Sequence, residues 1–388
     1  MTSRGRLLVL AVSVPVMAFA VIGGFMGKAS AQGASYRPLS VFEDVITLIL
    51  RNYVEEVDVN EVMHGAMHGL ADGLDPDSAF LDQAQVTAYQ AAKPAAAQVG
   101  LELTRQYYLR VIAARDNSPA KAAGLQPGDY IRAINGMPTR DTSVFEGMRE
   151  LDGAPGTTVT LTVLRGNAAE PHEIEMARAA LAPVAVSGRI AGPSVGLVRV
   201  PEFVADTPAQ IRKEVEALTK SGATSLVIDL RGTAFGAMDA GLAAARLFVP
   251  SGTLAFTRAR DKEKAPIAAG TGAGRITTPV ALLVDNGTAG PAELFAAALD
   301  GNDRATLIGE RTMGRAAEQK LVPLPDGSGL LLSYLFYLTP GGEVIHEQGL
   351  VPDVAVAQPR VDFGEPAPTG DETLDKAIET LTSAKPAA

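Results

Sequence analysis

The sequence predicts an α/β protein built from more than one domain, and three observations lead to this prediction. The chain has 388 residues, more than a single compact core usually fills. Hydrophobic residues make up 47% and charged residues 20%, a balance typical of globular chains and not of disordered ones. From residue 194 onward, apolar runs of strand length alternate with helical patterns, as they do in an α/β sheet.

Composition excludes several classes of function. The formal net charge of −10 argues against a nucleic-acid binder, because such proteins need a basic face. The absence of Cys excludes disulfides, thiolate metal sites and a cysteine nucleophile. His64 and His68 have the i, i+4 spacing of a helical metal site, but no acidic third ligand follows at a motif spacing. We interpret both as surface histidines, and the sequence calls for no metal ion or other cofactor.

The N-terminus has the pattern of an export signal. Arg4 and Arg6 precede an apolar run over residues 7–27, which is long enough to span a bilayer. Residues 29–31 read A-S-A, the small-residue pattern of a cleavage site. A retained membrane anchor and a removed signal peptide both fit this pattern. In either case we expect an exported, periplasmic protein, soluble or anchored to the inner membrane by residues 7–27.

Apolar periodicity predicts the remaining elements in order. Helices are expected within 34–85, up to a turn at 74–78, and an Ala-rich linker at 91–97. The strands expected next are 101–103, 109–112, 130–134 and 159–164, with a tight Asn-Gly turn at 135–136. The strands expected in the second half are 195–200, 225–230, 279–284 and 329–337. The helices expected there are 208–221, 292–299 and 372–382.

Five segments between residues 74 and 353 resemble, in the same order, motifs of the carboxy-terminal processing (tail-specific) serine peptidases. Residues 74–78, L-D-P-D-S, are similar to that family's L-D-P-H-S turn. Residues 118–129 are similar to the core of its PDZ domain, and I-D-L-R at 228–231 matches the start of its D-L-R-x-N-P-G-G element. Residues 337–342 and 349–353 resemble its Y-x-T-P-x-G and G-I-x-P-D segments.

The resemblance implies an α/β (α+β) multidomain fold with a helical N-terminal segment, a PDZ domain, and an α/β protease core around a parallel or mixed sheet. The expected boundaries are 1–31 for the signal or anchor, 32–95 for the helical segment, 96–167 for the PDZ domain, 168–360 for the protease-like core and 361–388 for the tail helix. Members of this family often self-associate through terminal helices. Residues 41–50 and 374–381 are the candidates for such contacts here.

The chain departs from the family at the two catalytic positions. The family's nucleophile is the second Ser of a G-S-A-S turn, which here reads G-T-A-G with Gly290 in that place. Its general base is the Lys of T-F-G-K-G-x-x-Q, which aligns with Arg315, while the Gln is retained as Gln319. The separation, 315 − 290 = 25, is the family's usual one. Glycine has no hydroxyl and arginine stays protonated above pH 12, so we expect the Ser–Lys mechanism to be lost.

Two further loops follow from the resemblance. The P-G-G loop keeps only its last glycine, Gly236, and the bulky Phe235 leaves less room at the position of the oxyanion loop. The carboxylate-binding loop is better preserved. The family's G-I-G pattern corresponds to Gln98, Val99, Gly100 and Leu101. Such a loop offers backbone N–H groups to a C-terminal carboxylate, and the strand after it adds the peptide as an extra strand.

Three interpretations remain. The favoured one is an inactive member that binds peptide C-termini, or a partner protein such as an active paralogue, through its PDZ domain. The second is a peptidase with a displaced dyad of Thr288 and Lys320. A shift of two residues moves a side chain by about 6–7 Å, far beyond hydrogen-bond tolerance, which argues against it. The third is a structural envelope protein with an unused groove, which the sequence does not separate from the first.

Overall fold

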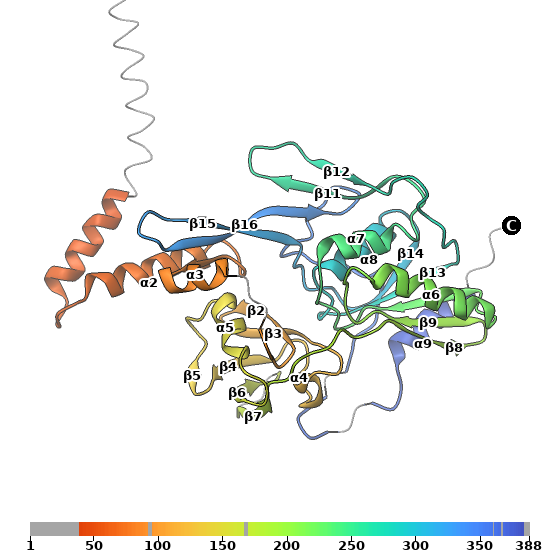
Figure 1. The fold of residues 1–388 in the computed structure, drawn as a ribbon, viewed down its shortest axis with the longest axis horizontal. Helices are drawn as coiled ribbons and strands as arrows, with labels where there is room; N and C mark the ends of the chain where they lie inside the picture. Colours follow the sequence, from red (N-terminus) through yellow and green to blue (C-terminus); the bar gives the residue numbers. More distant parts are fainter. Residues whose placement is uncertain (1–38, 92–94, 167–169, 360, 366–367, 384–388) are drawn as a thin grey trace, which may run out of the picture. The chain divides into compact units, whose positions relative to one another are not determined.

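The computed structural model describes residues 39–91, 95–166, 170–359, 361–365 and 368–383 (Figure 1). The chain divides into two units, up to Gly69 and from Leu70 onward. The predicted export signal, 1–31, lies outside the described residues. Within them, no helix is both long and apolar enough to cross a membrane.

The N-terminal region is helical, as predicted, over residues 39–52 and in α2 (Val59–Asp72). His64 and His68 lie on α2 with ring centroids 4.5 Å apart. Among the described residues, no group of three or more His, Cys, Asp or Glu side chains is placed to hold a metal ion. The helical prediction for 34–85 is wrong at β1 (Ala79–Leu81), which pairs with β16 (Gly329–Leu338). A run of three apolar residues is too short to show the alternation of a strand. The strand is therefore recognised only from its pairing with β16.

The region expected to form the PDZ domain contains one antiparallel sheet. Its strand order is β2-β3-β4-β6-β7, with β5 attached to β4, so β2 lies at an edge. The strands are β2 (Leu101–Gln106), β3 (Tyr108–Ala114), β4 (Tyr130–Ile134), β5 (Met137–Pro138), β6 (Thr158–Leu164) and β7 (His172–Ala177). The four predicted strands are confirmed, and the sheet continues through β7 past the expected boundary at 167. The helices are α4 (Pro119–Ala122) and α5 (Val144–Leu151).

The turn between β4 and β5 confirms the prediction made from the Asn-Gly pair. Asn135 and Gly136 have φ angles of 52° and 80°. A two-residue hairpin turn with positive φ at both positions follows the right-handed twist of its strands. The turn pairs β4 with β5, and β4 also pairs with β6 in the same sheet.

The second sheet carries the protease-like core. Its order is β17-β14-β13-β10-β9-β8, parallel except for the β8–β9 pair. The strands are β8 (Ser187–Gly192), β9 (Val195–Arg199), β10 (Ser225–Asp229), β13 (Val280–Val284), β14 (Ala305–Gly309) and β17 (Val354–Ala355). The helices are α6 (Thr207–Lys220), α7 (Met238–Ala245), α8 (Pro291–Asp300) and α9 (Glu372–Ser383).

Both faces of this sheet are covered, which explains the continuous apolar run of β13. Leu282 packs in the cluster that includes α6, α7 and α8, whereas its neighbour Leu283 packs with α9 on the opposite face. Successive side chains of a strand point to opposite faces. A strand between two helical layers therefore has no position left for a polar residue.

A third, antiparallel sheet borders the core. Its path is β1-β16-β11-β12, and β15 also pairs with β16. The remaining strands are β11 (Thr253–Ala259), β12 (Ala265–Ala268) and β15 (Ala317–Pro323). After β1, helix α3 (Gln83–Gln90) begins with a capping box, in which the Asp82 carboxylate accepts from the Gln85 N–H. The pairing of β1 with β16 brings the 74–78 turn to the strand that pairs with Gln319.

Candidate active site

The turn between β13 and α8 holds the position that the resemblance assigns to the nucleophile. Gly290 precedes α8 with φ 59° and ψ −118°. Glycine adopts this positive φ without the strain that a side chain brings. A Cβ at this position would meet nothing nearer than the Arg315 carbonyl oxygen, at 3.6 Å. The space for a side chain therefore remains, on the kind of sharp strand-to-helix turn that carries the nucleophilic Ser of α/β-hydrolases.

Glu293 joins this turn to the loop of the base position. Its side chain is fully buried and accepts four hydrogen bonds. Oε2 accepts from the backbone N–H groups of Gly290, at 3.0 Å, and Arg315, at 2.7 Å. Oε1 accepts from the N–H of Gly314, at 2.6 Å, and from the Thr312 hydroxyl. One carboxylate thus holds positions 290 and 315 in a defined relation.

The sequence prediction missed Glu293 as a site residue. Burial raises the pKa of its carboxyl, and the hydrogen bonds from Thr312 and from the three backbone N–H groups oppose this rise. Part of the signal was present, because Pro291 in the first helical position and a Glu three residues after Gly290 are typical of a helix start. The sequence does not show that the same carboxylate reaches the loop at 312–315.

Arg315 lies between two carboxylates. Its Nη2 is 3.1 Å from Asp77 Oδ1, and its Nε donates to Asp77 Oδ2 at 3.2 Å. Its Nη1 donates to Glu102 Oε1. Asp77 belongs to the turn before β1, and Glu102 belongs to β2 of the PDZ region, so the guanidinium connects two distant parts of the chain. The side chain of Arg315 is 24% exposed, that of Asp77 6% and that of Glu102 19%.

This ion-pair cluster of Arg315, Asp77 and Glu102 keeps the base position charged. Burial disfavours the charged guanidinium, but the carboxylates of Asp77 and Glu102 outweigh it and raise the pKa of Arg315 further above its usual value. Burial raises the pKa of Glu102, and the charge and hydrogen bond of Arg315 oppose that rise. A base must give up its proton to accept one from the nucleophile. Arg315 cannot do so here.

Gln319, the retained residue, supports the turn that carries Asp77. Its Nε2 donates to the Asp77 carbonyl oxygen at 2.7 Å. Within the turn, Asp75 Oδ1 accepts from the N–H groups of Asp77 and Ser78, at 2.9 and 2.8 Å. Gln319 therefore lies close to the ion-pair cluster and positions one of its carboxylates. In the sequence, this turn was identified only by its resemblance to a family motif. No pattern in the sequence indicated that Asp77 and Glu102 contact the same arginine.

The structure does not bring the displaced dyad together. Thr288 is fully buried, its Oγ1 donates to the Leu230 carbonyl at 2.9 Å, and it accepts from the Asp285 N–H at 3.0 Å. Lys320 lies on β15 with an exposed side chain, its Nζ 5.8 Å from the Tyr334 ring centroid. Thr288 is a structural residue of the turn. A hydroxyl held in this way is not free to attack a substrate.

The loop at the oxyanion position is occupied by apolar side chains. Phe235 packs with Ala289 and Met313 and with Ile112 of β3. Gly236 has φ 119°, and a Cβ there would lie 2.0 Å from the Phe203 carbonyl oxygen. The carbonyl of Phe235 accepts from the Phe203 N–H at 2.9 Å. An apolar cluster therefore lies beside the turn that leads to Gly290.

In the predicted carboxylate-binding loop, the carbonyl groups of Val99 and Gly100 accept backbone hydrogen bonds. Val99 O accepts from Ala120 N–H at 2.9 Å, and Gly100 O accepts from Arg115 N–H at 2.8 Å. Among the described residues, no backbone acceptor is found for the N–H groups of Val99 and Gly100. Gly100 has φ 78°, and a Cβ would lie 2.4 Å from that of Ser118, so only glycine fits. Two donors thus remain for a ligand at the start of β2, before Leu101.

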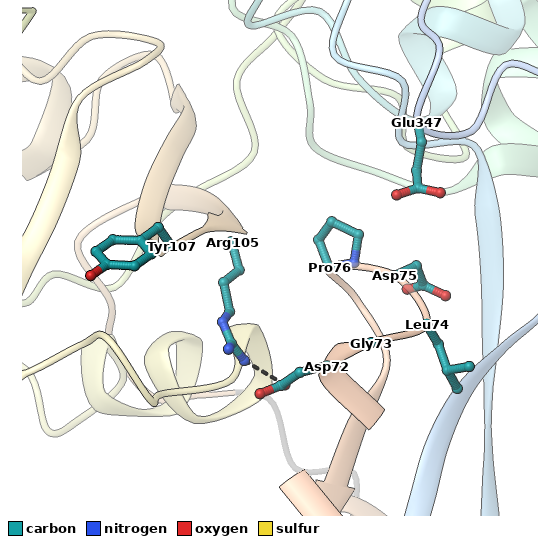
Figure 2. A pocket seen from close by; sticks show the side chains of 8 residues that line it. All are labelled: Asp72, Gly73, Leu74, Asp75, Pro76, Arg105, Tyr107 and Glu347. Atoms are coloured by element: carbon teal, nitrogen blue, oxygen red, sulfur yellow. Dashed lines mark ion pairs between the residues drawn. The ribbon is translucent and has the colours of Figure 1, made fainter. Parts of the chain in front are cut away.

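Two cavities adjoin the ion-pair cluster. One, of about 290 Å³, is lined by Arg315 and Asp77, by residues 104–106 and by His346. The other, of about 330 Å³, lies between residues 72–76 and the tip of the β2–β3 hairpin (Figure 2). Residues shared by both are Pro76, Arg105 and Glu347. In the second cavity Arg105 forms an ion pair with Asp72, drawn as a dashed line in Figure 2.

Comparisons with known proteins agree with the fold. Residues 194–356 match peptidase family S41, and residues 110–165 match the PDZ domain. The solved structure of a photosystem II D1 C-terminal processing protease superposes with a TM-score of 0.69 at 26% identity, covering 83% of this chain and 88% of that one.

Curated relatives cover much of the chain. A carboxyl-terminal-processing protease of Synechocystis is 35% identical over 278 residues, which are 71% of this chain but only 65% of that protein. A protein of the same description from Picosynechococcus is 33% identical over 277 residues, 71% of this chain and 67% of its own length. A carboxy-terminal-processing protease of Bartonella bacilliformis is 28% identical over 333 residues, 84% of this chain and 76% of its own length. By fold and by sequence, this chain belongs to the carboxy-terminal processing peptidases of family S41, with a PDZ domain.

Proposed function

We propose that this chain is a family member without peptidase activity, which binds the C-termini of peptides or of partner proteins. The observation that carries the proposal is the ion-pair cluster of Arg315, Asp77 and Glu102. A charged guanidinium stands at the base position, and Gly290 offers no hydroxyl in front of it. Covalent catalysis needs both a nucleophile and a base.

Binding of C-termini is supported by the start of β2. The unpaired N–H groups of Val99 and Gly100 suit a carboxylate, and β2 is an edge strand able to accept a peptide as a further strand. Main-chain hydrogen bonds from such an edge supply affinity whatever the sequence of the ligand. Pockets along the strand then decide which sequences bind best.

The N-terminal helix supports a protein partner, either a second copy of this chain or an active paralogue. Its apolar residues with more than 40% exposure are Leu39, Val41, Val45, Leu48 and Leu50. Several large apolar side chains exposed on one helix suit an interaction with a partner protein. We place the protein outside the cytoplasm, in the periplasm, on the strength of the export pattern in residues 1–31.

The first test is a cleavage and binding assay on the full-length chain, purified in mild detergent. The probe is a fluorescent ten-residue peptide with an apolar C-terminal residue, and the control is the same peptide with an amidated C-terminus. We expect no cleavage, and at least tenfold tighter binding of the free carboxylate form, since each 1.4 kcal/mol of carboxylate recognition is about a factor of ten. Cleavage that Thr288→Ala or Lys320→Ala abolishes would establish a displaced dyad instead. Equal, weak binding of both peptides would favour a purely structural role.

A second test asks whether the lost residues alone explain inactivity. We expect the double variant Gly290→Ser, Arg315→Lys to remain inactive, because Asp77 and Glu102 would hold the new lysine in its charged form. Adding Asp77→Asn and Glu102→Gln removes both charges, and we expect cleavage of an unfolded protein substrate to be detectable only in this fourfold variant. Cleavage by the double variant would show that the two carboxylates do not control the base position.

A further inference from the structure

The two cavities next to the ion-pair cluster have part of their walls in common and border the far end of β2. The larger one reaches Tyr107 at the hairpin tip, and the smaller one includes Thr104 on β2. Pro76, Arg105 and Glu347 border both. A chain leaving the start of β2 along its edge therefore arrives at these cavities.

The larger cavity has an excess of negative charge. Three carboxylates line it, and only one cation, Arg105, which is already paired with Asp72. Asp75 is held by the backbone of its own turn. Among the described residues, the side chain of Glu347 has no ion pair or hydrogen bond. Figure 2 shows its carboxylate directed toward the gap above Pro76 and Asp75.

A second, independent feature marks the smaller cavity as a place for a ligand. His346 is 4% exposed, and within the described part of the chain neither of its ring nitrogens has a hydrogen-bond partner. The ring stacks on Phe336 with centroids 4.7 Å apart, which leaves its polar edge unused. The buried Nε of Arg110, on the same wall, is also without a partner. Buried polar groups without partners are costly. Arg105, Arg110 and Arg315 line this cavity and the Arg110 Nε–H is a donor, so the cavity suits a hydrogen-bond acceptor, such as a peptide carbonyl oxygen, and not a cation.

We propose that the larger cavity, bounded by the Glu347 side chain that it shares with the smaller one, is an upstream subsite of the peptide-binding groove and takes a Lys or Arg side chain of the bound peptide. This rests on the proposed binding of C-termini. A peptide added antiparallel to β2, with its carboxylate at Val99 and Gly100, runs backward along the strand, one residue per about 3.3 Å. Arg105 is four positions past Leu101 (105 − 101 = 4), so the basic residue lies about four to six residues before the C-terminus.

The surroundings fit a long cationic side chain. The charged group of the Lys or Arg would form an ion pair with the carboxylate of Glu347. Polar groups of the adjacent peptide residues would form hydrogen bonds with the ring nitrogens of His346. Its aliphatic stem would lie against the exposed side chains of Leu74 and Tyr107. Arg140 lies over the Tyr107 ring, 4.8 Å from its centroid, so the ligand is expected to use the opposite side. An acidic side chain in the same place would face the carboxylates and be rejected.

The experiment compares three fluorescent peptides with one apolar C-terminus and Lys, Ala or Glu at positions four to six before the end. Anisotropy on the full-length chain measures their dissociation constants. We expect the Lys peptides to bind about fivefold tighter than the Ala peptide, because a partly exposed ion pair contributes only about 1 kcal/mol. The Glu peptide should bind weakest. The advantage of Lys should shrink as the NaCl concentration rises from about 0.05 to about 0.5 M, because salt screens the attraction between exposed charges.

The variant Glu347→Gln is expected to remove the advantage of Lys while leaving the affinity of the Ala peptide unchanged. Glu343→Gln, an exposed residue outside both cavities, is the matched control and should change nothing. Equal binding of the Lys and Ala peptides, or a preference for Glu, would overturn the subsite alone. Failure of every peptide with a free carboxylate would instead refute the proposed binding of C-termini.

Discussion

Replacing Arg315 with Met should lower the stability of the folded chain by about 3 kcal/mol, because it leaves two carboxylates enclosed without a counter-charge. Asp77 and Glu102 are 6% and 19% exposed and face each other across the guanidinium. Removing one partner of a buried ion pair typically costs about 3–5 kcal/mol, and partial exposure of Arg315 places the value at the lower end. Urea denaturation followed by circular dichroism measures the change.

Two further variants separate the ion-pair cluster from a general effect of mutation. Arg260→Met removes a fully solvent-exposed pair with Asp261 and should leave the denaturation midpoint unchanged. The triple change Arg315→Met, Asp77→Asn, Glu102→Gln neutralises the whole cluster and should recover most of the loss, since no charge stays buried. A triple variant as unstable as the single one would show that packing of the arginine, and not charge, accounts for the effect.

Glu293→Ala should have the largest effect of all single changes considered. It leaves the backbone N–H groups of Gly290, Gly314 and Arg315 and the Thr312 hydroxyl without their acceptor. Each buried donor left unsatisfied costs about 1–3 kcal/mol, so we expect a loss of at least 4 kcal/mol by this rough sum, or failure to accumulate as folded protein. Thermal unfolding and the yield of folded protein are the measurements.

Hydrogen exchange gives a more local readout of the same change. Amides at 290, 314 and 315 should exchange faster in Glu293→Gln, because the amide group replaces an acceptor oxygen with a donor that faces N–H groups. Glu379→Gln is the control, since Glu379 is an exposed partner of Lys376 on α9. Unchanged protection at 290 and 315 would mean that Glu293 does not hold the two loops.

Much of the fold follows from local pattern. Four of the six strands in the sheet of the PDZ domain, the buried strand β13 and helix α8 were predicted within a few residues, because alternation and continuous apolar runs report which faces are covered. β1 was not, and neither was β15. β1 has three residues and a partner that is remote in sequence, since Ala79 pairs with Leu331, whereas β15 pairs with β16, the next strand along the chain. Local propensity is too weak to identify such pairs.

The sequence by itself determined which residues stand at the two positions that the resemblance assigns to catalysis, Gly290 and Arg315. Glycine has no side-chain nucleophile, and arginine has no accessible neutral form, in any protein environment. Only the tertiary structure decided what replaces that chemistry. Arg315 meets Asp77 across 238 residues and Glu102 across 213, and a charge pair depends on distance in space, not along the chain. Folding therefore made Arg315 an ionic link between the turn at Asp77 and strand β2 of the PDZ domain.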